Sequence, residues 1–332
     1  MKHKMEENNT LSDAEAELYD RQIRLWGVES QKRLRSAKVL LIGANGFAAE
    51  TAKNIILAGV KSVTFLDHRN LSIEDTCSQF LAPKTEIGKN RAQASLQRAQ
   101  NLNPMVKVTA ETENVNDKSD KYFADFDVVC ATQCDIFQLQ KINNACREHN
   151  IKFFAGDVWG TIGFTFADLK THEFVEDVIQ SKKVCVPEGG DPIKKEKFEN
   201  ITVTVKRTEN FVPFNQILGL DELPKDSEIY YIILALWKYR SKYGQDPLPD
   251  QRNRDELKRE IEGIITYHKL GDKLNYYLDC DLYAQVSPVC AILGGIMGQE
   301  IIKAVSQKEA PHNNLFIFNP ETLCGKILKL GY

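Results

Sequence analysis

The sequence predicts an α/β chain with a doubly wound, Rossmann-like sheet and a smaller α+β segment inserted into it. Short apolar, strand-like segments alternate with helical ones over the first half of the chain. The first of these, "VLLI" at 39–42, runs into a glycine turn and then a helix, which is how nucleotide-binding folds begin. The alternation stops near Asp168, and core-like sequence returns at Ser287.

The chain is expected to open with helices. Ser12 and Glu15 stand at capping-box spacing, so a helix is expected to begin there, and a second short helix is expected over 29–36. The expected buried face of the first helix consists of Leu18, Ile23 and Leu25.

A succession of βαβ units is expected next. The expected strands are 39–42, 61–67, 106–111, 126–132, 151–156 and 162–169. The expected helices are 48–58, 89–101 and 137–148. Gly59 follows the first of them as a stop signal. Strands that alternate with helices form a parallel sheet, whose ligands bind at the carboxyl ends of the strands.

The expected division of the chain is an adenylation-like domain over 1–174, an inserted half-domain over 175–275, and the rest of the first domain over 276–332. The insertion carries lysine pairs that we interpret as solvated loop. Its expected elements are a strand at 201–207 and helices at 227–244 and 254–271.

The last segment is expected to hold an apolar helix over 287–306 and a hairpin with Asn319 and Pro320 in its turn. The helix contains Gly294, Gly295 and Gly298. Each interior glycine costs about 1 kcal/mol relative to alanine. We therefore expect these glycines to admit a neighbouring helix or sheet at close range.

Composition excludes several classes of protein. The 332 residues are 42% hydrophobic and 27% charged, which allows a well-buried core. The net charge of -3 argues against a general nucleic-acid or membrane-surface binder. The first ten residues contain no apolar run, so no secretory signal is expected. No cysteine pair has C-x-x-C spacing, which favours reduced thiols in a cytosolic or nuclear protein over structural zinc.

The turn between Gly43 and Gly46 is a candidate anion site, because backbone N–H groups at a helix N-terminus attract negative charge. Asp67 ends the second strand, where a carboxylate can accept hydrogen bonds from ribose hydroxyls. Together these features indicate a dinucleotide or adenosine site, although glycine turns of this kind also occur where they serve packing alone. An NAD-dependent oxidoreductase fits poorly, because no substrate domain with a histidine or Lys/Tyr proton donor is evident.

Several segments resemble the adenylation domains of the enzymes that activate ubiquitin-like modifiers, the ThiF-type fold. These segments are "LYDRQIRLWG", "VLLIGANGFAAE", "LDHRNLSIED", "IGKNRAQAS" and "PVCAILGGIMGQEIIKAVSQKEAPHNN". Within that family the chain is most similar to the smaller, non-catalytic subunits of heterodimeric members. The resemblance implies a larger catalytic subunit as obligate partner, with ATP and Mg²⁺ in the partner's site, SUMO as the modifier, and a nuclear, partly cytoplasmic location.

The same resemblance implies that this chain's own site is degenerate. Asp67 matches the ribose carboxylate of active members. Their phosphate- and metal-handling Asn, Arg, Lys and Asp are replaced here by Asp75, Ser78, Arg91 and Cys134. Asp135 could replace the metal-binding carboxylate only if the register shifted by one. Since a thiol is a poor ligand for Mg²⁺ and losing one oxyanion-type group costs about 10²–10³ in rate, we expect no metal or cofactor on this chain.

One functional residue is expected to act outside the chain. In the family, the arginine that matches Arg21 reaches across the dimer to the partner's ATP phosphates, as an arginine finger does. Without the resemblance, Arg21 and Arg24 would be interpreted as an ordinary solvated pair. Arg24 is expected to serve the interface or a local ion pair.

Catalysis by a cysteine is not expected. Cys185 lies where catalytic subunits carry their cysteine domain, but no histidine or motif accompanies it. The cysteines expected in or near the core are Cys130, Cys134, Cys146 and Cys290. Two alternatives stay open: a self-sufficient adenylating enzyme of the molybdopterin or thiamin pathway type, and a subunit that serves another modifier.

Overall fold

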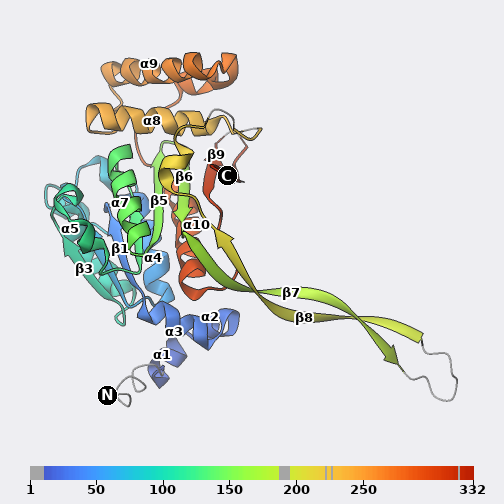
Figure 1. The fold of residues 1–332 in the computed structure, drawn as a ribbon. Helices are drawn as coiled ribbons and strands as arrows, with labels where there is room; N and C mark the ends of the chain where they lie inside the picture. Colours follow the sequence, from blue (N-terminus) through green and yellow to red (C-terminus); the bar gives the residue numbers. More distant parts are fainter. Residues whose placement is uncertain (1–10, 187–194, 221–222, 226, 321) are drawn as a thin grey trace.

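The computed structural model describes residues 11–186, 195–220, 223–225, 227–320 and 322–332, with backbone alone at 183–186 and 195–199. Its centre is an eight-stranded sheet in the order β10-β9-β6-β5-β4-β1-β2-β3. A two-stranded arm, β7–β8, extends far from this body (Figure 1).

The sheet is mixed. Its parallel part consists of β1 (Lys38–Ile42), β2 (Ser62–Leu66), β3 (Lys107–Glu111), β4 (Val128–Ala131) and β5 (Lys152–Trp159). Its antiparallel part consists of β6 (Ile162–Asp168), β9 (Leu315–Asn319) and β10 (Cys324–Leu328). The expectation of parallel strands is therefore confirmed for five strands and wrong for β6, whereas the hairpin expected near the end of the chain is confirmed by β9 and β10. The reason is a tight turn at Gly160, which returns β6 beside β5 without a crossover helix.

Helices cover both faces of the sheet (Figure 1). One face packs against α4 (Gly46–Ala58), α5 (Arg91–Leu102) and α10 (Ser287–Ser306). The other packs against α6 (Asp120–Phe123), α7 (Ile136–Glu148) and α8 (Ile229–Tyr243). Alternate residues of β1 enter opposite cores: Leu40 faces α7 and α8, whereas Leu41 faces α4 and α10. Because both faces are buried, the strand is a continuous apolar run.

Two of the α10 glycines let α4 approach closely. A Cβ on Gly294 would lie 2.5 Å from Glu50 Cβ, and one on Gly298 would lie 2.7 Å from Asn54 Cβ. The expected close approach is thus confirmed at these positions. Gly295 has nothing within 4 Å of its missing Cβ, so no neighbour in the described chain accounts for it. By length and composition α10 could cross a membrane, but 61% of its apolar window is buried inside the fold.

The N-terminal helices are α1 (Asp13–Leu18), α2 (Asp20–Trp26) and α3 (Val28–Ser36). The capping box of Ser12 and Glu15 is confirmed. The expected buried face is wrong for two of its three residues: Leu18 is 53% exposed and Leu25 is 73% exposed, whereas Ile23 is half-buried. A break at Tyr19 separates α1 from α2, and the Tyr19 ring is the buried anchor instead.

The segment expected as an insertion contains the arm and a helical layer. The arm pairs β7 (Thr171–Val186) with β8 (Lys195–Asn210), and β7 was not expected from the sequence. The layer contains α8, α9 (Gln251–His268) and the 3₁₀ segment Gly271–Asp279. Figure 1 shows α8 and α9 stacked above the sheet. The buried residues of α8 join the same apolar cluster as the sheet, so this layer shares the central core.

Candidate functional site: the glycine turn and the α2 face

The glycine turn connects β1 to α4 at the carboxyl end of the parallel strands. Gly43 has a φ of 87°, and a Cβ there would lie 2.3 Å from the Thr132 hydroxyl. Asn45 begins α4, and its side chain accepts a hydrogen bond of 2.8 Å from the Ala48 N–H. Both features agree with the predicted strand, turn and helix N-terminus.

Several N–H groups at this turn are engaged within the chain. The Ala44 N–H donates to Asp67 Oδ2 at 2.7 Å, and the Phe47 N–H donates to Gln285 Oε1 at 3.3 Å. Ala48 is held by Asn45, as described. A phosphate at this helix N-terminus would have to displace these acceptors.

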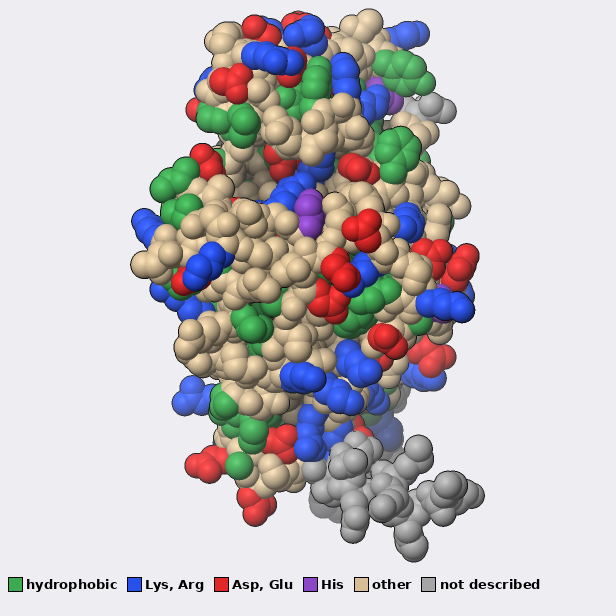
Figure 2. All heavy atoms as spheres, turned by 90° about the vertical axis from the view of Figure 1, so that its left-hand side faces the viewer, with side chains coloured by type: hydrophobic (Ala, Val, Ile, Leu, Met, Phe, Trp, Pro, Cys, Tyr) green, Lys and Arg blue, Asp and Glu red, His purple; other side chains and the backbone are tan. Residues whose placement is uncertain are grey.

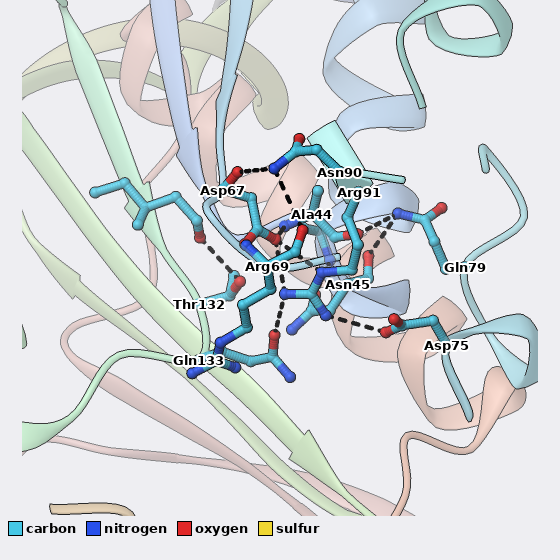
Figure 3. Close-up of polar contacts among 12 residues, drawn as sticks. Ala44, Asn45, Asp67, Arg69, Asp75, Gln79, Asn90, Arg91, Thr132 and Gln133 are labelled. Atoms are coloured by element: carbon cyan, nitrogen blue, oxygen red, sulfur yellow. Dashed lines mark hydrogen bonds and ion pairs between the residues drawn. The ribbon is translucent and has the colours of Figure 1, made fainter. Parts of the chain in front are cut away.

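A buried cluster fills the position expected for the ribose (Figure 3). The Arg91 guanidinium lies 2.6 Å from Asp67 Oδ2 and 3.0 Å from Asp75 Oδ1, and it donates to Gln133 Oε1 at 2.7 Å. Only 4% of the Arg91 side chain and 2% of the Asp67 side chain are exposed. Burial by itself would lower the pKa of Arg91, but the charges of Asp67 and Asp75 raise it above its ordinary value. The arginine therefore stays charged inside the protein.

Local structure explains why Arg91 points inward. Asn90 is the N-cap of α5, and its side-chain amide donates to the Asp67 carbonyl at 2.6 Å. This bond fixes the first turn of α5 against the end of β2. Asp75 is held in turn by the Ser72 N–H at 2.9 Å.

Two cavities meet at Arg91. The one beside Gly43 and Asp67 has a volume of about 30 Å³, which is room for about one water. The other, of about 490 Å³, is bordered by Trp159, Asp246 and Gln285. Arg69, Arg91 and Gln133 line both cavities.

The other altered positions are also occupied by structural contacts. Ser78 is buried against Gly46, where a Cβ would lie 2.1 Å from the Ser78 hydroxyl. Cys134 is buried, and burial raises the pKa of its thiol to about 12. Asp135 is the N-cap of α7 and accepts from the Gln138 N–H at 2.8 Å. Its carboxylate is therefore engaged in capping, as its sequence position before α7 requires.

A second buried ion cluster borders the larger cavity and was not found from the sequence. Arg240 on α8 lies 2.7 Å from Asp157 on β5 and 2.7 Å from Asp246 in the loop after α8. Burial raises the pKa of Asp157 to about 6, although Arg240 opposes the shift. Gln133 joins the two clusters, because its N–H donates to Asp157 while its side chain accepts from Arg91. The φ of Gln133 is 53°, which is unusual for a non-glycine residue, and no sequence pattern predicts this conformation.

The "LYDRQIRLWG" segment divides into anchoring and exposed residues. The Tyr19 ring packs on Gly59, and its hydroxyl accepts from Asn103 at 2.8 Å. Gln22 donates to the Leu57 carbonyl at 3.2 Å. Arg24 pairs with Asp20 at 3.0 Å, which confirms the local ion pair that was one expectation for it.

Arg21 lies on the exposed side of α2 and makes no ion pair or hydrogen bond with the described part of the chain. Leu25 lies one turn later on the same side. A cation next to an exposed leucine is thus presented to the outside by a helix that Tyr19 and Gln22 fix in place. We call the exposed residues Leu18, Arg21, Leu25 and Val28 the α2 face.

An exposed apolar stripe runs along α10. The α10 stripe consists of Ala291, Ile292, Gly295, Ile296 and Ile302 together with the polar Gln299, which are all exposed or half-buried. Figure 2 shows a different surface, at the left of Figure 1, where acidic and basic side chains are interspersed and apolar ones are scattered. An apolar stripe with a glycine in its middle is typical of a helix that another element covers.

The cysteines expected in the core are confirmed there. Cys130, Cys134, Cys146 and Cys290 are all buried. The side chain of Cys185 lies outside the described residues.

Comparison with known proteins agrees with this geometry. The ThiF family profile matches residues 19–330. SUMO-activating enzyme subunit 1 of Xenopus laevis is 46% identical over 339 residues, which cover 98% of each chain. The proteins of the same name from Homo sapiens and Danio rerio are 43% and 41% identical, and the matches cover 96% and 94% of each chain respectively.

Solved structures share the fold. Escherichia coli MccB, crystallised with a succinimide, has a TM-score of 0.56 at 11% identity, over 95% of this chain and 72% of that one. PaaA has a TM-score of 0.57 at 15% identity, over 96% of this chain and 76% of that one.

Proposed function

The chain belongs to the ThiF family, and on this basis we propose that it is the smaller, non-catalytic subunit of a SUMO-activating enzyme. Its role is to support the adenylation of SUMO, and the thioester transfer that follows, by a larger subunit. The proposal is supported by the relatives, which are named SUMO-activating enzyme subunit 1 and resemble this chain over nearly the whole length of both chains.

The occupied glycine turn carries the proposal that this chain does not adenylate by itself. Attack of a carboxylate on the α-phosphorus of ATP builds negative charge that N–H groups, cations and Mg²⁺ must neutralise. Here the Ala44 and Phe47 N–H groups are engaged by Asp67 and Gln285. The position of the metal-binding carboxylate is the buried thiol of Cys134. The contacts at the glycine turn therefore favour a structural role for it over adenylation.

The partner's site is where we place the ATP and Mg²⁺, and Arg21 is the residue of this chain that we assign to it. Its guanidinium is exposed, and it stands on a helix that is rigidly held. An arginine supplied in trans can neutralise phosphate charge without a rearrangement in its own chain.

The α2 face and the α10 stripe support an obligate partner. Leu25 is 73% exposed and Ile292 is 44% exposed. Leu25 lies among exposed apolar residues of α1, α2 and α3, and Ile292 belongs to the stripe on α10. Obligate interfaces are large and apolar, and a glycine such as Gly295 allows a second helix to come close. We propose that the larger subunit covers both surfaces, and that the heterodimer works in the nucleus and partly in the cytoplasm.

A reconstitution assay tests the proposal. The chain alone, with ATP and SUMO, should give no ATP–pyrophosphate exchange. The chain combined with the larger subunit should give SUMO adenylate and thioester. Exchange by the isolated chain would instead favour the self-sufficient adenylating enzyme, and activity with a different modifier but not SUMO would move the chain to another branch of the family.

A further inference from the structure

We propose that Arg91 is a built-in occupant of the nucleotide site, and that its side chain is the partition that keeps adenosine out of this chain. The inference rests on the proposed function in one respect, namely that the site descends from a nucleotide site. It adds a physical reason why the site is closed and a structural role for Asp67.

The geometry of the cavities is the first argument. A nucleotide pocket needs roughly 300–1,000 Å³, whereas the cavity beside Asp67 has about 30 Å³. The adjoining cavity of about 490 Å³ has the size but is separated from Asp67. Arg69, Arg91 and Gln133 line both spaces, and of these three it is Arg91 whose guanidinium spans from Asp67 to Asp75. Removing this one side chain is therefore expected to join the two cavities.

Hydrogen bonding is the second argument. Asp67 Oδ2 accepts from the Ala44 N–H and from Arg91 Nε at 2.9 Å, and Oδ1 accepts from the Arg69 N–H at 2.9 Å. A ribose would need these same oxygens. Asp67 is thus already used as the counter-ion of Arg91 and the acceptor for the turn, which accounts for its presence in a site without phosphate chemistry.

Charge is the third argument. The guanidinium of Arg91 is already paired with the carboxylates of Asp67 and Asp75, so it is not available to a phosphate. A triphosphate brought to this position would meet these two carboxylates in a buried environment, where charges are weakly screened, with Arg69 as a partly offsetting cation. The same cluster is satisfied internally by Gln133 and the Ser72 N–H, so it does not require a ligand.

The test is adenosine binding to the full chain, measured by isothermal titration calorimetry. Adenosine carries no phosphate, so its binding measures whether the cavity is accessible, without any effect of phosphate charge. The variant is Arg91→Ala combined with Asp75→Asn, which opens the partition without leaving both carboxylates unpaired. The matched control is Arg98→Ala, an exposed arginine on the same helix that donates to the Phe80 carbonyl.

The wild-type chain and Arg98→Ala should show no saturable binding at millimolar adenosine. The double variant should bind adenosine saturably, with a dissociation constant at least about tenfold below the highest concentration at which the wild-type chain shows no binding, because a newly accessible pocket would offer a ribose acceptor. Adding Asp67→Asn should abolish that binding. Equal binding by wild type and double variant, or no binding by a folded double variant, would overturn the proposal.

A second measurement needs only the wild-type chain, in case the double variant does not fold. The side-chain Nε–H of Arg91 should give a resonance that is protected from solvent and unchanged by millimolar ATP. A shift of this resonance on adding ATP would show that nucleotide reaches Arg91 and would refute a closed site. These results concern the isolated chain, so they stand even if the reconstituted enzyme proves to act on another modifier.

Discussion

Two adjacent glycines in α10 should respond in opposite directions to the same substitution. Gly294→Ala places a Cβ 2.5 Å from Glu50 Cβ and 3.0 Å from the Thr51 backbone nitrogen, so α4 and α10 must move apart. Gly295→Ala meets nothing within 4 Å. Both changes gain about 1 kcal/mol from helix propensity, but only Gly294→Ala incurs overpacking, which costs about 1–3 kcal/mol.

We therefore expect Gly295→Ala to stabilise the isolated chain. The free energy of unfolding of Gly294→Ala should be about 1–3 kcal/mol lower than that of Gly295→Ala. Urea denaturation followed by far-UV circular dichroism measures the difference. Because Gly295 lies on the α10 stripe, Gly295→Ala should also weaken the heterodimer that we propose, measured by analytical ultracentrifugation. Equal stability of the two variants would mean that α4 and α10 are not in close contact.

Arg21→Ala should leave the heterodimer intact but lower SUMO adenylation by at least about tenfold, because a phosphate counter-charge is lost; wild-type pyrophosphate exchange in the variant complex would argue against a role in trans. Ser78→Arg combined with Cys134→Asp should not give the isolated chain pyrophosphate exchange, since the other altered positions remain, and measurable exchange would contradict a degenerate site. Burial, and then the charge of Lys152, lowers the pKa of His172 to about 4, so the unfolded state binds the proton more readily and stability should fall by up to about 3 kcal/mol as pH drops from 6.5 to 4. His172→Gln should remove this decline relative to wild type in urea titrations; the raised pKa of Asp157 acts with the opposite sign in the same window, but it is common to both proteins.

The regular elements were predictable because their signals are local. The helix predicted over 287–306 has the same bounds as α10 in the structure. Gly59 adopts the left-handed conformation that ends α4. The antiparallel pairing of β5 and β6 through the turn at Gly160 was not predictable, because a continuous apolar segment is compatible with a parallel or an antiparallel strand. The partner strand β7 was missed for a related reason, since its charged residues lack the alternation that marks "ITVTVKR".

The face of α2 illustrates a limit of periodicity. Leu18 and Leu25 have the spacing of a buried stripe, yet both are exposed. Apolar spacing indicates that a face will be covered, but it cannot say whether the cover belongs to the same chain. The anchoring contact through Tyr19 and Gly59 joins residues far apart in the sequence and could only be found in the fold.

By itself the sequence determined the strand, turn and helix of the glycine loop and the carboxylate at Asp67 that ends the second strand. These properties depend on residue identity and short spacing. Only the tertiary structure decided that Arg91 turns inward to Asp67 and Asp75, that Gln285 accepts from the N–H of Phe47 at the turn, and that Arg21 is exposed on α2. The reason is physical: whether a charge is paired, buried or exposed depends on which distant segments the sheet and its helices bring together.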